Sequence, residues 1–78
     1  MAIEEETRVW LAGILHCDQD KLNEDAGVGK TPGWDSLGHL NVMMELDRQY
    51  GIEINDETVR KFQEIGAIEQ VVANKEKI

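Results

Sequence analysis

The sequence predicts an all-α fold, a small four-helix bundle with three longer helices, one short helix and a long first loop. Three observations lead to this fold class. Apolar residues recur every three or four positions over most of the chain, no segment suggests a plausible β-sheet, and 78 residues suffice for one domain with a thin core. We expect residues 1–78 to form a single domain with one site and without a deep enzymatic cavity.

Composition narrows the functions that such a domain can have. The net charge is −8, from 16 acidic and 8 basic side chains, so the basic surface that nucleic-acid binding needs is absent. The acidity indicates partners with basic docking patches, although it also serves solubility alone. The single cysteine, Cys17, favours a reducing compartment. Without a targeting signal or a membrane-length apolar run, we expect a cytoplasmic monomer that does not insert into membranes.

The first expected helix covers residues 3–16. The residues that repeat at helical spacing are Ile3, Thr7, Trp10, Leu11, Ile14 and Leu15. Acidic residues in its first turn suit the helix dipole. Gly13 lowers helix stability by up to about 1 kcal/mol relative to alanine, and we interpret it as a point of close contact with a neighbouring helix.

Residues 17–34 form the expected long loop, which is rich in Asp, Asn, Gly and Lys. The apolar residues available to anchor it are Leu22, Ala26 and Val28. Its acidic run, residues 18–25, is a poor match to a calcium-binding EF-hand loop, because Leu22 and Asn23 stand where that loop needs an oxygen ligand and a glycine. We interpret the run as a solvated loop that leads the chain to Ser36.

The second expected helix begins at Asp35 or Ser36, either of which is a suitable N-cap, and ends before Gly51. Its apolar residues fall on one broad arc and are Leu37, Leu40, Val42, Met43, Met44, Leu46 and Tyr50. An arc this wide predicts that several helices surround the segment. The opposite face is expected to carry Gly38, Asn41, Glu45, Arg48 and Gln49.

The sequence pattern in the last third of the chain predicts two more helices. Residues 52–54 are expected to be extended, with Ile52 and Ile54 both in the core. Asn55 or Asp56 should cap a short third helix over residues 57–62, the least stable of the four. A last helix is expected over residues 66–74, and its apolar positions are Ile65, Ile68, Val71 and Val72.

Three interpretations of Ser36 follow from the residues around it. Ser36 and His39 lie three apart on one helix, so a nucleophile and base beside Asp35 are conceivable. The G-x-S-x-G turn and the sheet of serine hydrolases are absent, however, and His39 falls inside the apolar arc. Ser36 could also serve only as a helix cap. Finally, a serine on a first helical turn after an exposed loop is accessible for attachment of an anionic group, which the helix N-terminus favours.

Several segments together resemble an acyl carrier protein. They are Gly33-Trp34-Asp35-Ser36-Leu37, the methionine-rich helix closed by Leu46-Asp47-Arg48-Gln49-Tyr50-Gly51-Ile52-Glu53-Ile54, and Asp56-Glu57. The resemblance covers nearly the whole chain, including its size, acidity and long first loop. It implies that Ser36 receives phosphopantetheine from coenzyme A through a separate, magnesium-dependent phosphopantetheinyl transferase. The arm then carries acyl groups as thioesters, and the domain itself performs no reaction.

The resemblance also assigns roles to other residues. Asp35 would cap the helix and help the transferase to recognise the site. The second helix would be the recognition helix for acyl-loading and acyl-transferring enzymes with basic docking patches. Its expected apolar contacts are Leu37 and Met44, which could instead be ordinary core residues. The acidic residues expected to dock are Glu45, Asp47, Glu53, Asp56 and Glu57. An acyl chain could be sheltered between helices by Met43, Met44, Ile54, Val59, Phe62 and Ile68, although these residues would equally make a core.

The chain departs from carriers of primary fatty acid synthesis at two positions near Ser36. Such carriers usually have acidic residues where this sequence has Gly38 and Asn41. Asn55 stands where proline is frequent. We therefore expect a discrete carrier of a specialised pathway, such as polyketide, lipid or surface-glycan assembly, with fatty acid synthesis still possible. The alternatives are a peptidyl or aminoacyl carrier and, more remotely, an unmodified acidic interaction module.

Overall fold

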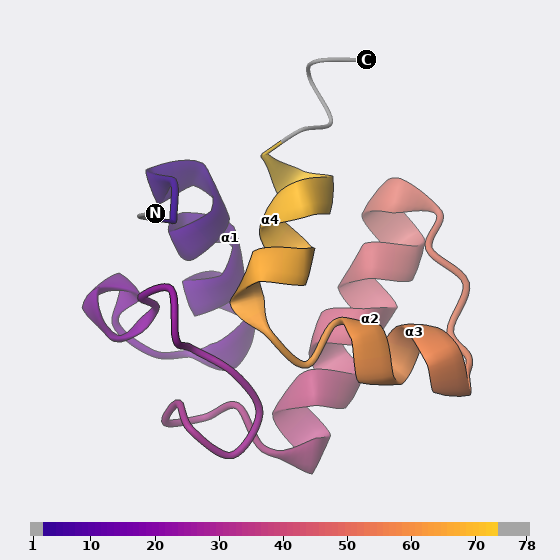
Figure 1. The fold of residues 1–78 in the computed structure, drawn as a ribbon, viewed down its shortest axis with the longest axis horizontal. Helices are drawn as coiled ribbons and strands as arrows, with labels where there is room; N and C mark the ends of the chain where they lie inside the picture. The colour runs from indigo at the N-terminus through magenta and orange to yellow at the C-terminus, as the bar shows by residue number, and fades with distance from the viewer. Residues whose placement is uncertain (1–2, 74–78) are drawn as a thin grey trace.

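The computed structural model describes residues 3–73, and within this range four α-helices and no β-strand are formed. The helices are α1 (Glu5–Leu15), α2 (Ser36–Tyr50), α3 (Asp56–Lys61) and α4 (Ile65–Val72). α1 contacts both α2 and α4, and α3 lies across α2 (Figure 1). The predicted bundle of three longer helices, one short helix and a long first loop is confirmed.

The helix ends follow the local sequence. Gly51, with φ of 71°, ends α2 in the left-handed conformation that favours glycine. At the start of α3, the Asn55 side chain accepts from the Thr58 backbone N–H at 2.9 Å, and the Thr58 hydroxyl accepts from the Asn55 N–H at 3.0 Å. This reciprocal cap offsets the shortness of α3. The predicted end of the last helix at Asn74 lies outside the described residues.

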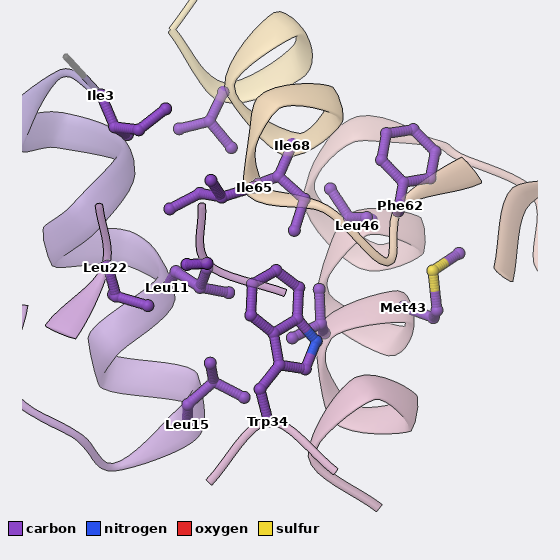
Figure 2. Close-up of a cluster of buried hydrophobic side chains, with 13 residues drawn as sticks. Ile3, Leu11, Leu15, Leu22, Trp34, Met43, Leu46, Phe62, Ile65 and Ile68 are labelled. Carbon is purple, nitrogen blue, oxygen red and sulfur yellow. The ribbon is translucent and has the colours of Figure 1, made fainter. Parts of the chain in front are cut away.

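The hydrophobic core is built around a residue of the loop. Trp34 is completely buried, and Figure 2 places its indole between Leu11 and Leu15 of α1 and Met43 and Leu46 of α2. Burial of an aromatic side chain of this size contributes more to the core than any aliphatic neighbour. The sequence interpretation missed this anchor, because Trp34 stands among polar and glycine residues without helical spacing.

The loop between α1 and α2 is ordered throughout, although its composition suggested little structure. It contains a short 3₁₀ helix, η1 (Gln19–Lys21), and buries Leu22 and Ala26 as expected. It is also paired with the start of α4. The Val28 N–H donates to the Gln63 carbonyl at 3.0 Å, and the Ile65 N–H donates to the Ala26 carbonyl at 3.1 Å.

Four expectations about packing are wrong. Gly13 has open space around it, so it marks no helix contact. Gly38, expected on the polar face of α2, is buried. Ile54 is 39% exposed and does not enter the core, whereas Ile52 packs against it. The wide apolar arc of α2 is not surrounded by helices, because Leu37, Leu40 and Met44 on it face solvent.

Candidate functional site

Ser36 is the first residue of α2 and its side chain is exposed. The residue before it, Asp35, is the N-cap, and its carboxylate accepts from the Gly38 N–H at 2.8 Å. The Asp35 carbonyl accepts from the His39 N–H at 2.8 Å. Because Asp35 caps the helix, the Ser36 hydroxyl is not needed for capping. This result removes the interpretation of Ser36 as a cap.

Two glycines set the position of this first turn. Gly33 has φ of 84°, and a Cβ there would lie 2.8 Å from the Leu15 carbonyl oxygen at the end of α1. A Cβ on Gly38 would collide with the Gly33 carbonyl oxygen and approach Leu15 Cδ2. The loop, the end of α1 and the start of α2 therefore touch backbone to backbone, and side chains at either glycine would force them apart.

His39 connects the Ser36 turn to α3 through two hydrogen bonds, one buried and one partly buried. Its Nδ1 accepts from Trp34 Nε1 at 3.0 Å, and its Nε2 contacts the Val59 carbonyl oxygen at 2.7 Å. Since Trp34 Nε1 can only donate and the carbonyl can only accept, the ring carries its proton on Nε2. Val59 lies in the last turn of α3, where backbone carbonyls lack helical partners, so His39 also caps that end.

The hydrogen bonds of His39 argue against serine catalysis at Ser36. His39 is 4% exposed, and both of its ring nitrogens are engaged with Trp34 and Val59. Neither nitrogen is free to take a proton from the Ser36 hydroxyl, which points to solvent from the first turn. The structure thus supports the sequence-based view that His39 is a packed residue, and His39 is not placed to act as a base for Ser36.

The two predicted apolar docking residues face solvent. Leu37 is 69% exposed and Met44 is 48% exposed, so neither is a core residue. Leu40, which was expected in the buried arc, is 49% exposed and lies on the same side of α2. The sequence indicates that these three side chains lie on one side of the helix, because positions 37, 40 and 44 follow the spacing of a single helix face. The buried face of α2 is instead formed by Gly38, His39, Val42, Met43 and Leu46.

The predicted acidic docking residues are spread over three segments. Glu45 accepts from Arg48 Nη2 at 2.6 Å and from Gln49 Nε2 at 2.7 Å, and these bonds lower the pKa of the Glu45 carboxyl. Asp47 lies exposed on α2 and Glu53 on the connection that follows. Asp56 and Glu57 are exposed in the first turn of α3, where they also complement the helix dipole. Whether any of them contacts a partner stays a prediction.

The residues proposed to shelter an acyl chain do not share one surface. Met43, Phe62 and Ile68 are at most 2% exposed and belong to the core, while Val59 packs partly against it. Met44 and Ile54 are exposed, and Met44 faces away from the core. A chain entering between α2 and α3 would therefore have to displace packed side chains, and Met44 could not line its path.

Ser36 and the residues around it contain no site for a metal ion. Within residues 3–73, no group of three or more His, Cys, Asp or Glu side chains is placed to hold one. No helix in this range has the length and apolar character needed to cross a membrane.

No model of a known protein family matches the chain.

Proposed function

We propose that this chain is a carrier domain in which the Ser36 hydroxyl tethers phosphopantetheine. The observation that carries the proposal is the presentation of Ser36. Its side chain is exposed on the first turn of α2, and the capping carboxylate of Asp35 and the buried indole of Trp34 fix the backbone before it. Ser36 is also the only serine in the chain, so modification of serine can occur at one position alone.

The surroundings of Ser36 fit an attached phosphodiester. The first N–H groups of an α-helix have no acceptor within the helix, and their partial positive charge favours an anion. Apart from the N-cap Asp35, whose carboxylate is bonded to the Gly38 N–H, the first turn of α2 contains no acidic residue that would repel it. Ser36 and Leu37 supply the backbone N–H groups that remain after the Gly38 N–H has bonded to Asp35.

The chain would contribute the nucleophile and little else to its own modification. Ser36 Oγ attacks the phosphorus of coenzyme A that bears pantetheine, forming a phosphodiester while the nucleotide portion leaves. The hydroxyl proton goes to a base of the transferase, because His39 is engaged on both sides. Asp35 holds the turn through its cap, which keeps the hydroxyl in a constant position as the transferase approaches. The bound arm supplies a thiol for acyl groups.

The resemblance in sequence favours an acyl cargo from a specialised pathway over an amino acid or peptide. The uncharged Gly38 and Asn41 beside the site distinguish it from carriers of primary fatty acid synthesis. A peptidyl or aminoacyl carrier would share the same attachment chemistry. Loading assays that offer an activated acyl donor and an activated amino acid to the modified chain would separate these cargo classes.

Mass spectrometry tests the proposal directly. The purified chain is incubated with coenzyme A, magnesium and a promiscuous phosphopantetheinyl transferase, and we expect a mass gain of one phosphopantetheine group at Ser36. Ser36→Ala should gain nothing while keeping the circular dichroism spectrum of the wild type, since the side chain is exposed. A wild-type chain that gained no mass under these conditions would leave an unmodified interaction module as the function.

A further inference from the structure

The turn that carries Ser36 is closed by a hydrogen bond between two buried side chains. Trp34 Nε1 donates to His39 Nδ1 at 3.0 Å, and the two residues are 0% and 4% exposed. Ser36 lies between them in the sequence, so its backbone belongs to the segment that this bond closes. If His39 moved away, the buried indole N–H would be left without an acceptor. The geometry of the Ser36 turn is therefore tied to the position of the imidazole.

The other ring nitrogen ties the imidazole to α3. His39 Nε2 donates to the Val59 carbonyl at 2.7 Å, and Val59 lies in the second half of α3. Hydrogen bonds weaken steeply when their atoms move out of line. A shift of α3 that carries the Val59 carbonyl with it must either break this bond or turn the imidazole away from Trp34 Nε1.

A second route joins the same two regions through the main chain. The Trp34 carbonyl accepts from the Gly29 N–H at 3.0 Å, and the preceding Val28 N–H donates to the Gln63 carbonyl at 3.0 Å. Gln63 follows shortly after the end of α3. Trp34 is thus connected to the end of α3 through its side chain and, by way of the loop, through its backbone.

The helix at the other end of both routes, α3, is weakly anchored. It is six residues long, and its side chains are exposed or half-buried. A helix this short is not stable by itself, so its position depends on the contacts at its two ends. The reciprocal cap between Asn55 and Thr58 holds the first end. The His39 bond and the buried side chain of Phe62 hold the last end.

We infer that His39 is a positioning residue for the modification of Ser36, and that it makes the geometry of the Ser36 turn depend on the docking of α3 against α2. The inference rests on the proposed function, since it concerns how the Ser36 hydroxyl is aligned for attack on coenzyme A. With both ring nitrogens bonded, the backbone on either side of the hydroxyl is fixed. When α3 shifts, the turn relaxes and the attack becomes slower. A ligand or partner that displaces α3 therefore slows modification of Ser36 without contacting it.

The kinetics of phosphopantetheine transfer separate positioning from a simple loss of stability. The rate of mass gain with a promiscuous transferase is measured against carrier concentration, at saturating coenzyme A and magnesium. For His39→Leu we expect kcat to fall about 10-fold while KM stays within about 3-fold of wild type, because the transferase binds a folded chain whose hydroxyl is misaligned. A variant that is merely less stable contains fewer competent molecules, so its apparent KM rises and kcat does not fall.

Two further variants serve as controls for His39→Leu. His39→Asn places an oxygen where Nδ1 lies and can still accept from Trp34, so kcat should recover to within about 3-fold of wild type. Val72→Ala removes buried methyl groups from the last turn of α4, which lies far from the start of α2 in Figure 1, and should leave kcat unchanged. An unchanged kcat in His39→Leu, or an equal fall of kcat in Val72→Ala, overturns the inference.

Hydrogen exchange tests the coupling to α3 in the unmodified chain, and it does not require His39→Leu to fold. Asn55→Ala removes the first cap of α3 and leaves His39 in place, which should increase opening of α3 about 5-fold. NMR should find that exchange of the Trp34 indole N–H accelerates together with that of the α3 amides. In a His39→Asn background, the same change should alter indole exchange by less than about 2-fold.

The outcomes distinguish this inference from the proposed function. An indole N–H whose exchange does not respond to Asn55→Ala, in a chain that is modified at Ser36, overturns the inference alone. A wild-type chain that gains no mass overturns both.

Discussion

Cys17 is partly buried where the chain leaves α1, and this environment alters its chemistry. Burial raises the pKa of the Cys17 thiol above its ordinary value, and the neighbouring Asp18 carboxylate raises it further. Less thiolate is then present at pH 8 than for an unperturbed cysteine, so we expect alkylation by iodoacetamide to be several-fold slower than that of glutathione. Asp18→Asn should speed the reaction. A Cys17 as reactive as glutathione would contradict this prediction, whereas a slow one would let the thiol of an attached arm be labelled selectively.

Thr7 lies inside the core with an unsatisfied hydroxyl. Its side chain is completely buried, and its Oγ1 has no hydrogen-bond partner among residues 3–73. Thr7→Val keeps the shape and removes the buried polar group, so the free energy of unfolding should rise by about 1 kcal/mol. Urea denaturation followed by circular dichroism measures the change.

Thr31 provides the matched control for Thr7. It is also buried, but its Oγ1 accepts from the Gly27 N–H at 3.1 Å. Thr31→Val leaves that N–H unpaired and should lower the free energy of unfolding by about 1–3 kcal/mol. If both valine variants changed stability in the same direction, the assignment of the two hydroxyls would be wrong.

At the level of helices, the contact between the loop and α2 depends on the absence of a side chain at position 38. Gly38→Ala should lower the free energy of unfolding by about 1–3 kcal/mol, because backbone atoms of Gly33 must move to admit the methyl group. Gly13→Ala is the control within α1. Nothing lies near its Cβ position, so the higher helix propensity of alanine should raise stability by up to about 1 kcal/mol. Thermal denaturation compares the two, and equal effects would exclude the steric explanation.

The link between α2 and α3 depends on His39. Replacing it by leucine leaves the buried Trp34 N–H and the Val59 carbonyl without their partner, so the free energy of unfolding should fall by about 2 kcal/mol or more. His39→Gln retains one donor and one acceptor and should lose less. Nitrogen NMR of the imidazole should find the proton on Nε2. Finding it on Nδ1 would be incompatible with the bond from Trp34.

Helix periodicity predicted the elements well but could not divide the apolar residues of α2 between two environments. Almost half of the residues of α2 are apolar, and spacing alone does not say which of them are covered. The structure assigns Val42, Met43 and Leu46 to the core and leaves Leu37, Leu40 and Met44 exposed to solvent. Which apolar residues of α2 are buried depends on where the loop and α1 contact this helix. These contacts join segments that are distant in sequence.

For the whole molecule, the dominant electrostatic feature is its excess of negative charge. With a net charge of −8, the folded chain repels itself, and salt reduces that repulsion. The free energy of unfolding should therefore rise as NaCl increases from about 10 to about 500 mM, as followed by urea titration at pH 7. A chain carrying both Asp20→Asn and Glu53→Gln should gain less from salt. Stability that fell with added salt would indicate that attractive ion pairs prevail.

The sequence predicted the number of helices and placed Ser36 in the first turn of the second helix, because these features depend on local spacing and capping residues. It did not identify Trp34 as the centre of the core, His39 as the connection between helices, or the pairing of the loop with the start of α4. Each of these depends on the folded arrangement of separate segments. The acyl carrier resemblance indicated what Ser36 could do, and the packing indicates how its position is held.

The pairing of residues 26–28 with residues 63–65 has a consequence for synthesis of the protein. Ser36 leaves the ribosome well before Gln63 and Ile65 do. The loop in front of the serine lacks these hydrogen bonds until the later residues are available. A nascent or prematurely terminated chain would contain the complete Trp-Asp-Ser sequence but would lack the two backbone hydrogen bonds that hold the loop in front of it.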